Sequence, residues 1–96
     1  MKWPARLVHI EWRDSYSIGT TAWVNLKEMG SATSPDIIHT VGWVHAETQD
    51  WISIVPHISF DRAKPNKPRT ISGHMSIPKC SIINVRELSL GADCEF

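Results

Sequence analysis

Residues 39–60, HTVGWVHAETQDWISIVPHISF, decide the fold of this chain of 96 residues. Two apolar runs flank a short polar turn at residues 47–50, a pattern typical of a β-hairpin. The predicted pairs are Ala46 with Trp51, Val44 with Ser53, Trp43 with Ile54 and Val41 with Pro56. Strand side chains alternate between two faces. The alternation therefore predicts a core face of Val41, Trp43, Ile52, Ile54 and Ile58, and a mixed face of Thr40, Gly42, Val44, Ser53, Val55 and His57.

The segments around this hairpin predict further short strands. Residues 6–13 alternate, with Val8, Ile10 and Trp12 on one side. Residues 14–21 form a polar connection, and residues 23–29 are predicted as one or two helical turns. Residues 74–77 and 81–88 are predicted strands, separated at residues 78–80 by a break the size of one 3₁₀ turn. We expect one domain over residues 1–96, with its core in residues 6–88, a basic exposed loop at 61–72 and a loose tail at 89–96.

Five short strands with these connections predict a mainly β fold. The long irregular connection after the first strand and the short break before the last favour a small five-stranded SH3-like or Sm-like barrel. Pro56 lies inside a predicted strand, where it cannot donate a ladder hydrogen bond, so at least one strand edge is expected to stay open. An open edge favours a homo-oligomer.

The charges are balanced in total but unevenly placed. The net charge is zero, which gives no overall signal for nucleic acid or for an anionic membrane. Residues 62–86 nevertheless carry six basic side chains and no acid. No stretch approaches the roughly 18 to 20 apolar residues that span a bilayer, and the first residues lack the apolar centre of a signal peptide. Cys80 and Cys94 match no zinc or redox spacing. We expect a cytoplasmic protein without a membrane partner.

The sequence contains no local signature of catalysis or of a metal site. A nucleophile, a base and an orienting group must lie within hydrogen-bond reach, and no motif brings these together. Two of the five histidines, His39 and His45, share a strand face but lie about 20 Å apart at strand rise, too far to bind one ion. We therefore predict no catalytic residue, no metal and no cofactor, and a protein that is not an enzyme.

Two segments carry a resemblance to a group of known sequences. GWVHAETQDWISIVPHIS at residues 42–59 and GHMSIPKCSIINVREL at residues 73–88, with HIEWRDSYS at residues 9–17, resemble the shared core of small uncharacterised phage and prophage proteins. The resemblance covers about two thirds of the chain and assigns no chemistry. It implies a cytoplasmic location in an infected bacterial host. Small phage proteins include inhibitors of host enzymes and sponges that sequester nucleotide signals of Thoeris or CBASS-type defence.

Binding of a small phosphorylated nucleotide is the function that the residues favour. Such a ligand needs cations for its phosphate, a flat apolar ring for its base and hydroxyl or amide groups for its ribose. The predicted contacts are Arg62, Lys64, Lys67 and Arg69 for phosphate, Trp51 for stacking, and Ser15, Ser17 and His57 for polar recognition. Two alternatives stay open: a protein-binding inhibitor of a host enzyme, and an Sm-like binder of single-stranded nucleic acid.

Overall fold

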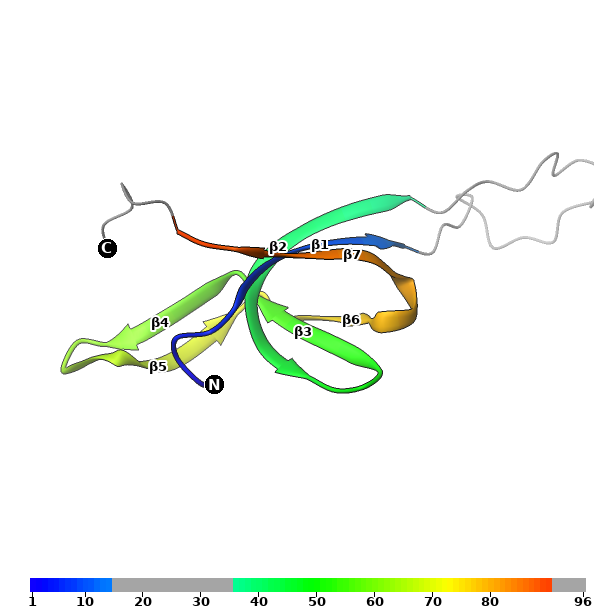
Figure 1. The fold of residues 1–96 in the computed structure, drawn as a ribbon. Coiled ribbons are helices and arrows are strands. Elements are labelled where there is room, and N and C mark those ends of the chain that lie inside the picture. The colour runs from blue at the N-terminus through cyan, green and yellow to red at the C-terminus, as the bar shows by residue number, and fades with distance from the viewer. Residues whose placement is uncertain (15–35, 91–96) are drawn as a thin grey trace, which may run out of the picture.

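The structure, a computed structural model, describes residues 1–14 and 36–90 (Figure 1). Within these residues it contains seven strands and one 3₁₀ turn. In chain order they are β1 (Leu7–Arg13), β2 (Ile37–Glu47), β3 (Trp51–Val55), β4 (His57–Asp61), β5 (Lys64–Ser72), β6 (Met75–Pro78), η1 (Lys79–Ser81) and β7 (Ile82–Leu88). The expected mainly β fold is confirmed. The predicted helix at residues 23–29 and almost all of the predicted connection at 14–21 lie outside the described residues, as does most of the predicted tail.

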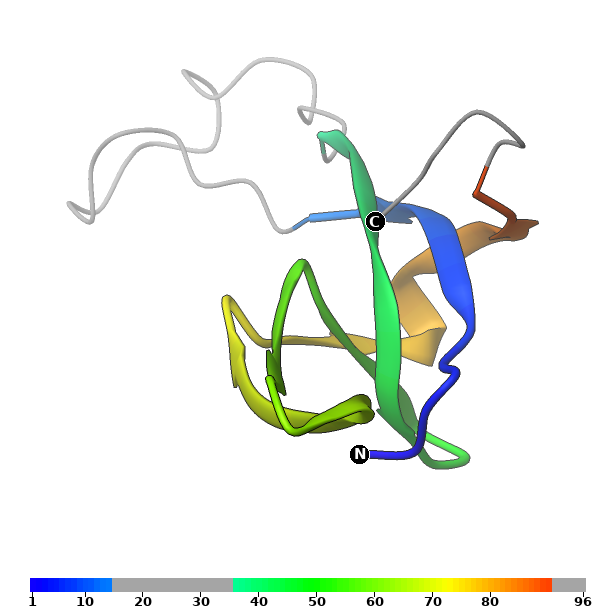
Figure 2. The same cartoon turned by 90° about the vertical axis from the view of Figure 1, so that its left-hand side faces the viewer.

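Five of the strands form one antiparallel sheet in the order β6-β3-β2-β1-β7. The two edge strands, β6 and β7, follow one another in the chain and are joined by η1. The 3₁₀ turn was predicted within one residue of its observed position. Figure 2 shows how strongly the sheet curves. Among the described residues β6 and β7 do not pair, so the sheet stays open and does not close into a barrel.

The core lies on the inner face of this sheet. Val8 and Ile10 from β1, Ile52 and Ile54 from β3 and Ile77 from β6 each keep 2% or less of their surface exposed. Trp12, Val44 and Ile82 pack around them. Each such aliphatic side chain contributes about 1.5 to 3 kcal/mol when fully buried. The predicted inward side of β1, with Val8, Ile10 and Trp12, is confirmed.

The predicted register of the β2–β3 hairpin is wrong: next to the turn Ala46 pairs with Ser53 instead of Trp51, and β2 also contains a bulge. Trp43 pairs with Val55 and Val44 with Ile54, and the register then shifts between Val44 and Ala46. One extra residue in a strand reverses the alternation beyond it. The core face of β2 therefore carries Gly42 and Val44 in place of Val41 and Trp43, and Val41 is 52% exposed.

The residues Gly42 and Ser53 fit the observed faces of β2 and β3. A Cβ atom at Gly42 would lie 3.0 Å from the Val55 carbonyl oxygen, so the close approach of the two strands favours glycine. Ser53 lies on the opposite face of β3 from Ile54 and has no exposed surface. Its hydroxyl is compensated by hydrogen bonds to neighbouring side chains, which allows a polar group to be buried there.

The basic segment predicted as a loop at residues 61–72 is instead half of a two-stranded β-arm. β4 pairs with β5 in an antiparallel ladder separate from the main sheet. Pro65 and Pro68 argued against a strand, but β5 has a neighbour on one side only, and such a strand accommodates residues without an N–H. At the tip, the Ala63 N–H donates to Asp61 Oδ1 (2.9 Å) and closes the turn. The segment is mostly exposed, as predicted.

A kink separates the arm from the sheet. Pro56 interrupts the chain between β3 and β4, and Gly73 lies between β5 and β6 with φ of 78°, in the left-handed region. A Cβ atom at Gly73 would lie 2.8 Å from Cγ of Pro56, so the two residues are packed against each other. Glycine is therefore required by both conformation and space. In Figure 1 the arm projects to one side of the sheet.

Candidate functional site

An open hollow lies on the β4–β5 arm. It has a volume of about 460 Å³ and is lined by Ser59, Phe60, Asp61, Arg62, Arg69 and Thr70. The register explains why these residues meet: Ser59 pairs with Thr70, and the ladder shifts on either side of Phe60. Bulges of this kind change the direction in which side chains point and often lie beside functional sites. The volume is within the usual range for small-ligand pockets.

Two of the four predicted phosphate-binding cations line this hollow. Arg62 lies at the arm tip and Arg69 in the middle of β5, and both are exposed. Lys64 and Lys67 are exposed on the same arm but do not line the hollow. None of the four forms an ion pair with another described residue. Two guanidinium groups without a carboxylate partner can bind the oxygens of a phosphate in a forked geometry.

The remaining walls of the hollow supply an aromatic ring, hydroxyl groups and one acid. The Phe60 ring is half-buried and meets the Trp3 ring edge-on, with 4.9 Å between the ring centroids. Trp3 also contacts Trp43 of the main sheet at 6.2 Å, so this aromatic chain connects the arm to the sheet. The hydroxyls of Ser59 and Thr70 are hydrogen-bonded to each other. Asp61 accepts the turn hydrogen bond, which assigns its carboxylate a structural role.

The structure does not bring the other predicted ligand contacts into the hollow. Trp51 begins β3, where its backbone pairs with Pro78. The stretch of chain from Trp51 to the arm tip is about 35 Å long at strand rise, and Figure 1 shows the β2–β3 turn on the side away from that tip. His57 is exposed at the base of the arm, opposite Ser72. Ser15 and Ser17 lie outside the described residues. Trp51 is 38% exposed and, as predicted, is the most exposed of the described tryptophans.

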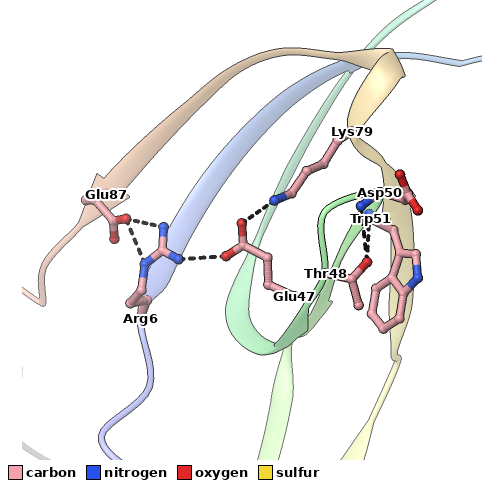
Figure 3. A network of polar contacts seen from close by, with 7 residues as sticks. All are labelled: Arg6, Glu47, Thr48, Asp50, Trp51, Lys79 and Glu87. Atoms are coloured by element: carbon pink, nitrogen blue, oxygen red, sulfur yellow. Dashed lines mark hydrogen bonds and ion pairs between the residues drawn. The ribbon is translucent and has the colours of Figure 1, made fainter.

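A chain of alternating charges links Arg6 with side chains of β2, η1 and β7 (Figure 3). Arg6 donates to Glu87 through Nε (2.8 Å) and to Glu47 through Nη1 (3.1 Å), and Lys79 Nζ lies 2.7 Å from Glu47 Oε2. The hydrogen bond from Lys79 and the charge of Arg6 lower the pKa of Glu47. The hydrogen bond to Glu87 raises the pKa of Arg6. Because every charge has a partner, this network is suited to fastening β2, β7 and η1 together rather than to binding an ion.

Two histidine pairs escaped prediction because they form across strands. His9 Nε2 lies 2.9 Å from His39 Nδ1, and the ring planes differ by 8°. Ring centroids 5.1 Å apart show that the rings meet edge to edge and share a hydrogen bond. This bond engages both facing nitrogens. His45 and His74 meet edge to face, with centroids 5.6 Å apart. The described residues contain no cluster of three or more His, Cys, Asp or Glu side chains able to hold a metal ion.

A serine and a histidine also meet on the outer face of β3. Ser53 Oγ lies 2.5 Å from His74 Nε2 and 3.1 Å from Ser76 Oγ. Such a pair resembles a nucleophile and its base, but substrate atoms must reach the nucleophile. Ser53 has no exposed surface, so in this conformation its contacts stabilise the junction of β5 and β6.

Among the described residues, no helix is long and apolar enough to cross a membrane.

These observations identify the arm hollow, with Arg62, Arg69 and Phe60, as the candidate ligand site. Its signal in the sequence was the basic run at residues 62–69. The contribution of Phe60 was missed because its position depends on the bulges in the arm. Comparison with known proteins finds no family model, no curated protein and no solved structure that matches this chain.

Proposed function

We propose that the protein is a non-catalytic binder of a small phosphorylated nucleotide, held in the hollow of the β4–β5 arm. The observation that carries this proposal is the pair of exposed arginines, Arg62 and Arg69, on the wall of a hollow of about 460 Å³. Their guanidinium groups bind the phosphate oxygens. The Phe60 ring lies against the base, and the hydroxyls of Ser59 and Thr70 donate to or accept from the ribose.

The resemblance to phage proteins suggests which nucleotide this is. A protein that binds a signalling nucleotide without converting it lowers the free concentration of that signal. The proposed role is therefore that of a phage sponge acting in the host cytoplasm against a nucleotide signal of Thoeris or CBASS-type defence. The strand order β6-β3-β2-β1-β7 and the 3₁₀ turn before the last strand support an SH3-like or Sm-like classification of the scaffold.

The test compares two double variants with the same loss of charge. Arg62→Ala with Arg69→Ala removes the cations that line the hollow, whereas Lys64→Ala with Lys67→Ala removes two cations from the same arm outside it. The ligands tested are AMP, ADP, cyclic ADP-ribose and a cyclic dinucleotide. Thermal unfolding and calorimetry measure their binding. At a ligand concentration 100-fold above Kd, the wild type should gain about 2.7 kcal/mol of stability.

The arginine variant should lose this stabilisation and the lysine variant should keep most of it. A change of Phe60 to Leu should preserve phosphate binding but weaken discrimination between bases. Equal losses in the two double variants would contradict a site confined to the hollow. The absence of stabilisation by every probe would contradict the proposed class of ligand.

One observation favours a second candidate, a binder of single-stranded nucleic acid. Lys64 and Lys67 extend the positive charge of the arm beyond the hollow, and an extended cationic ribbon matches an extended phosphate backbone. Affinity for an oligonucleotide should then fall steeply with salt concentration, and both double variants should weaken it equally. The remaining alternative, inhibition of a host enzyme, would leave both double variants active towards their protein target.

A further inference from the structure

The last strand of the sheet has a free edge. β7 pairs with β1 along one side, and no described residue pairs with its other side. Every residue of β7 after Ile82 is exposed. Three of these are apolar: Ile83 is 44% exposed, Val85 is 38% exposed and Leu88 is 39% exposed. An edge that presents unpaired backbone groups beside apolar side chains is suited to accepting another strand.

The edges formed by β6 and β5 carry features that oppose strand addition. β6 has four residues and ends at Pro78, which has no N–H to donate. β5 contains two prolines and three cations. Lysine and proline are common devices that keep edge strands from associating. In β7 the comparable features are the register shift opposite Glu11 and Trp12 and the two charged side chains, Arg86 and Glu87. Residues 84–88 still form a regular edge without proline or lysine.

A second hollow lies beside the inner face of β7. It has a volume of about 290 Å³, and its apolar wall is formed by Ile52, Ile82 and Val85. Arg6, Glu47 and Lys79 of the charge network form its rim. A strand added to the edge of β7 extends the sheet over this hollow. Side chains on the inner face of the added strand would then cover the apolar wall.

We infer that this edge binds a second copy of the chain, with the two β7 strands antiparallel about a twofold axis at Val85. A twofold axis perpendicular to the sheet keeps the inner faces of both copies on the same side. Two residues that pair across the axis must therefore both have odd numbers or both have even numbers. The axis at Val85 places the two Val85 side chains together on the face of the two hollows. It also places Asn84 opposite Arg86 of the second copy. An axis at Arg86 or at Glu87 would place two like charges directly opposite each other.

The register is tested by two substitutions at one exposed position. Asn84→Glu places a carboxylate opposite Arg86 of the second copy and should strengthen the dimer. Asn84→Arg places two guanidinium groups opposite each other and should weaken it. Within one chain Asn84 pairs with Glu11, so the effects on monomer stability have the opposite sign. A change in dimerisation therefore cannot be a consequence of altered folding stability.

Sedimentation velocity and light scattering over a range of protein concentrations measure the dimerisation of each variant. The wild type should pass from 10.9 kDa to about twice that mass as concentration rises. The Asn84→Glu variant should dimerise at about tenfold lower concentration than the wild type, and Asn84→Arg at about tenfold higher concentration, each corresponding to about 1.4 kcal/mol. A monomer at every concentration, a ring of three or more chains, or identical behaviour of the two variants would overturn the inference. Because Asn84 lies outside the arm, nucleotide binding should be unchanged in both variants.

Discussion

The five-stranded sheet and the β4–β5 arm are built from the same kind of strand but are stabilised differently. The sheet contains all the side chains that are fully buried among the described residues, from Val8 to Ile77. The arm contains none, and its half-buried residues, among them Ile58, Phe60 and Ile71, lie between exposed polar and charged ones. The arm is attached through the Pro56–Gly73 kink and the Trp3 contact with Phe60.

This difference separates stability from binding. Burial of aliphatic side chains holds the sheet together, so substitutions there should change the free energy of unfolding. The cations of the arm lie in solvent without ion-pair partners among the described residues, so their removal should change ligand binding and leave stability nearly constant. The chain can therefore vary the ligand-binding arm without losing its core.

The largest expected effect comes from truncating the core. Ile54→Ala removes three carbons from a side chain that is 1% exposed and should lower the free energy of unfolding by about 3 to 4 kcal/mol. The matched change in the arm, Ile71→Ala, removes the same atoms from a half-buried side chain and should cost about 1 kcal/mol. Urea unfolding measures both. If Ile54→Ala does not fold, Ile54→Val should cost about 1 kcal/mol. Equal losses at the two positions would contradict a core confined to the sheet.

A substitution in the kink should lower the free energy of unfolding by an intermediate amount. Gly73→Ala adds a Cβ atom that would lie 2.8 Å from the Pro56 ring, at a φ that alanine rarely adopts. We expect a loss of about 1 to 3 kcal/mol in the free energy of unfolding. The backbone amide resonances of β4 and β5 should shift more than those of β1. Ser72→Ala, one residue earlier, provides the control and should be nearly neutral. A neutral Gly73→Ala variant would show that the junction relaxes freely.

The smallest effect should come from the charge network. Glu47→Gln removes both ion pairs of an exposed carboxylate, and we expect a loss of about 0.5 to 1 kcal/mol at pH 7. Folding lowers the pKa of Glu47, so its stabilisation is present above the unfolded pKa of about 4.3 and is lost as pH falls through the folded value. Wild type and variant should therefore converge in acid and in concentrated salt. A difference that persists at pH 2 would have another cause.

The alternation of apolar residues was sufficient to predict the strands of the sheet but not all of their faces. Val8, Ile10 and Trp12 were assigned correctly because most of β1 is regular. The face of β2 was reversed because no residue type marks the bulge between Val44 and Ala46, which the pairing with β3 reveals. Bulges depend on both strands of a ladder, and one strand pattern cannot locate them.

The candidate site was predicted in its charges but not in its shape. The basic run at residues 62–69 was recognised from composition alone. Two prolines led to its interpretation as a loop, since their tolerance in β5 depends on the absence of a second neighbouring strand. The most exposed tryptophan was identified correctly, but its distance from the arm could not be known before the order of β3 and β4 was observed.

The proposal that the arm hollow binds the ligand is tested most directly by nuclear magnetic resonance. The ¹⁵N-labelled protein is titrated with ADP, and the backbone amides and tryptophan indole N–H groups are followed together. We expect the largest shifts at Phe60, Arg62 and Thr70, with the indole of Trp51 unmoved. A shift of the Trp51 indole while the arm resonances stay in place would contradict the assignment of the site to the arm.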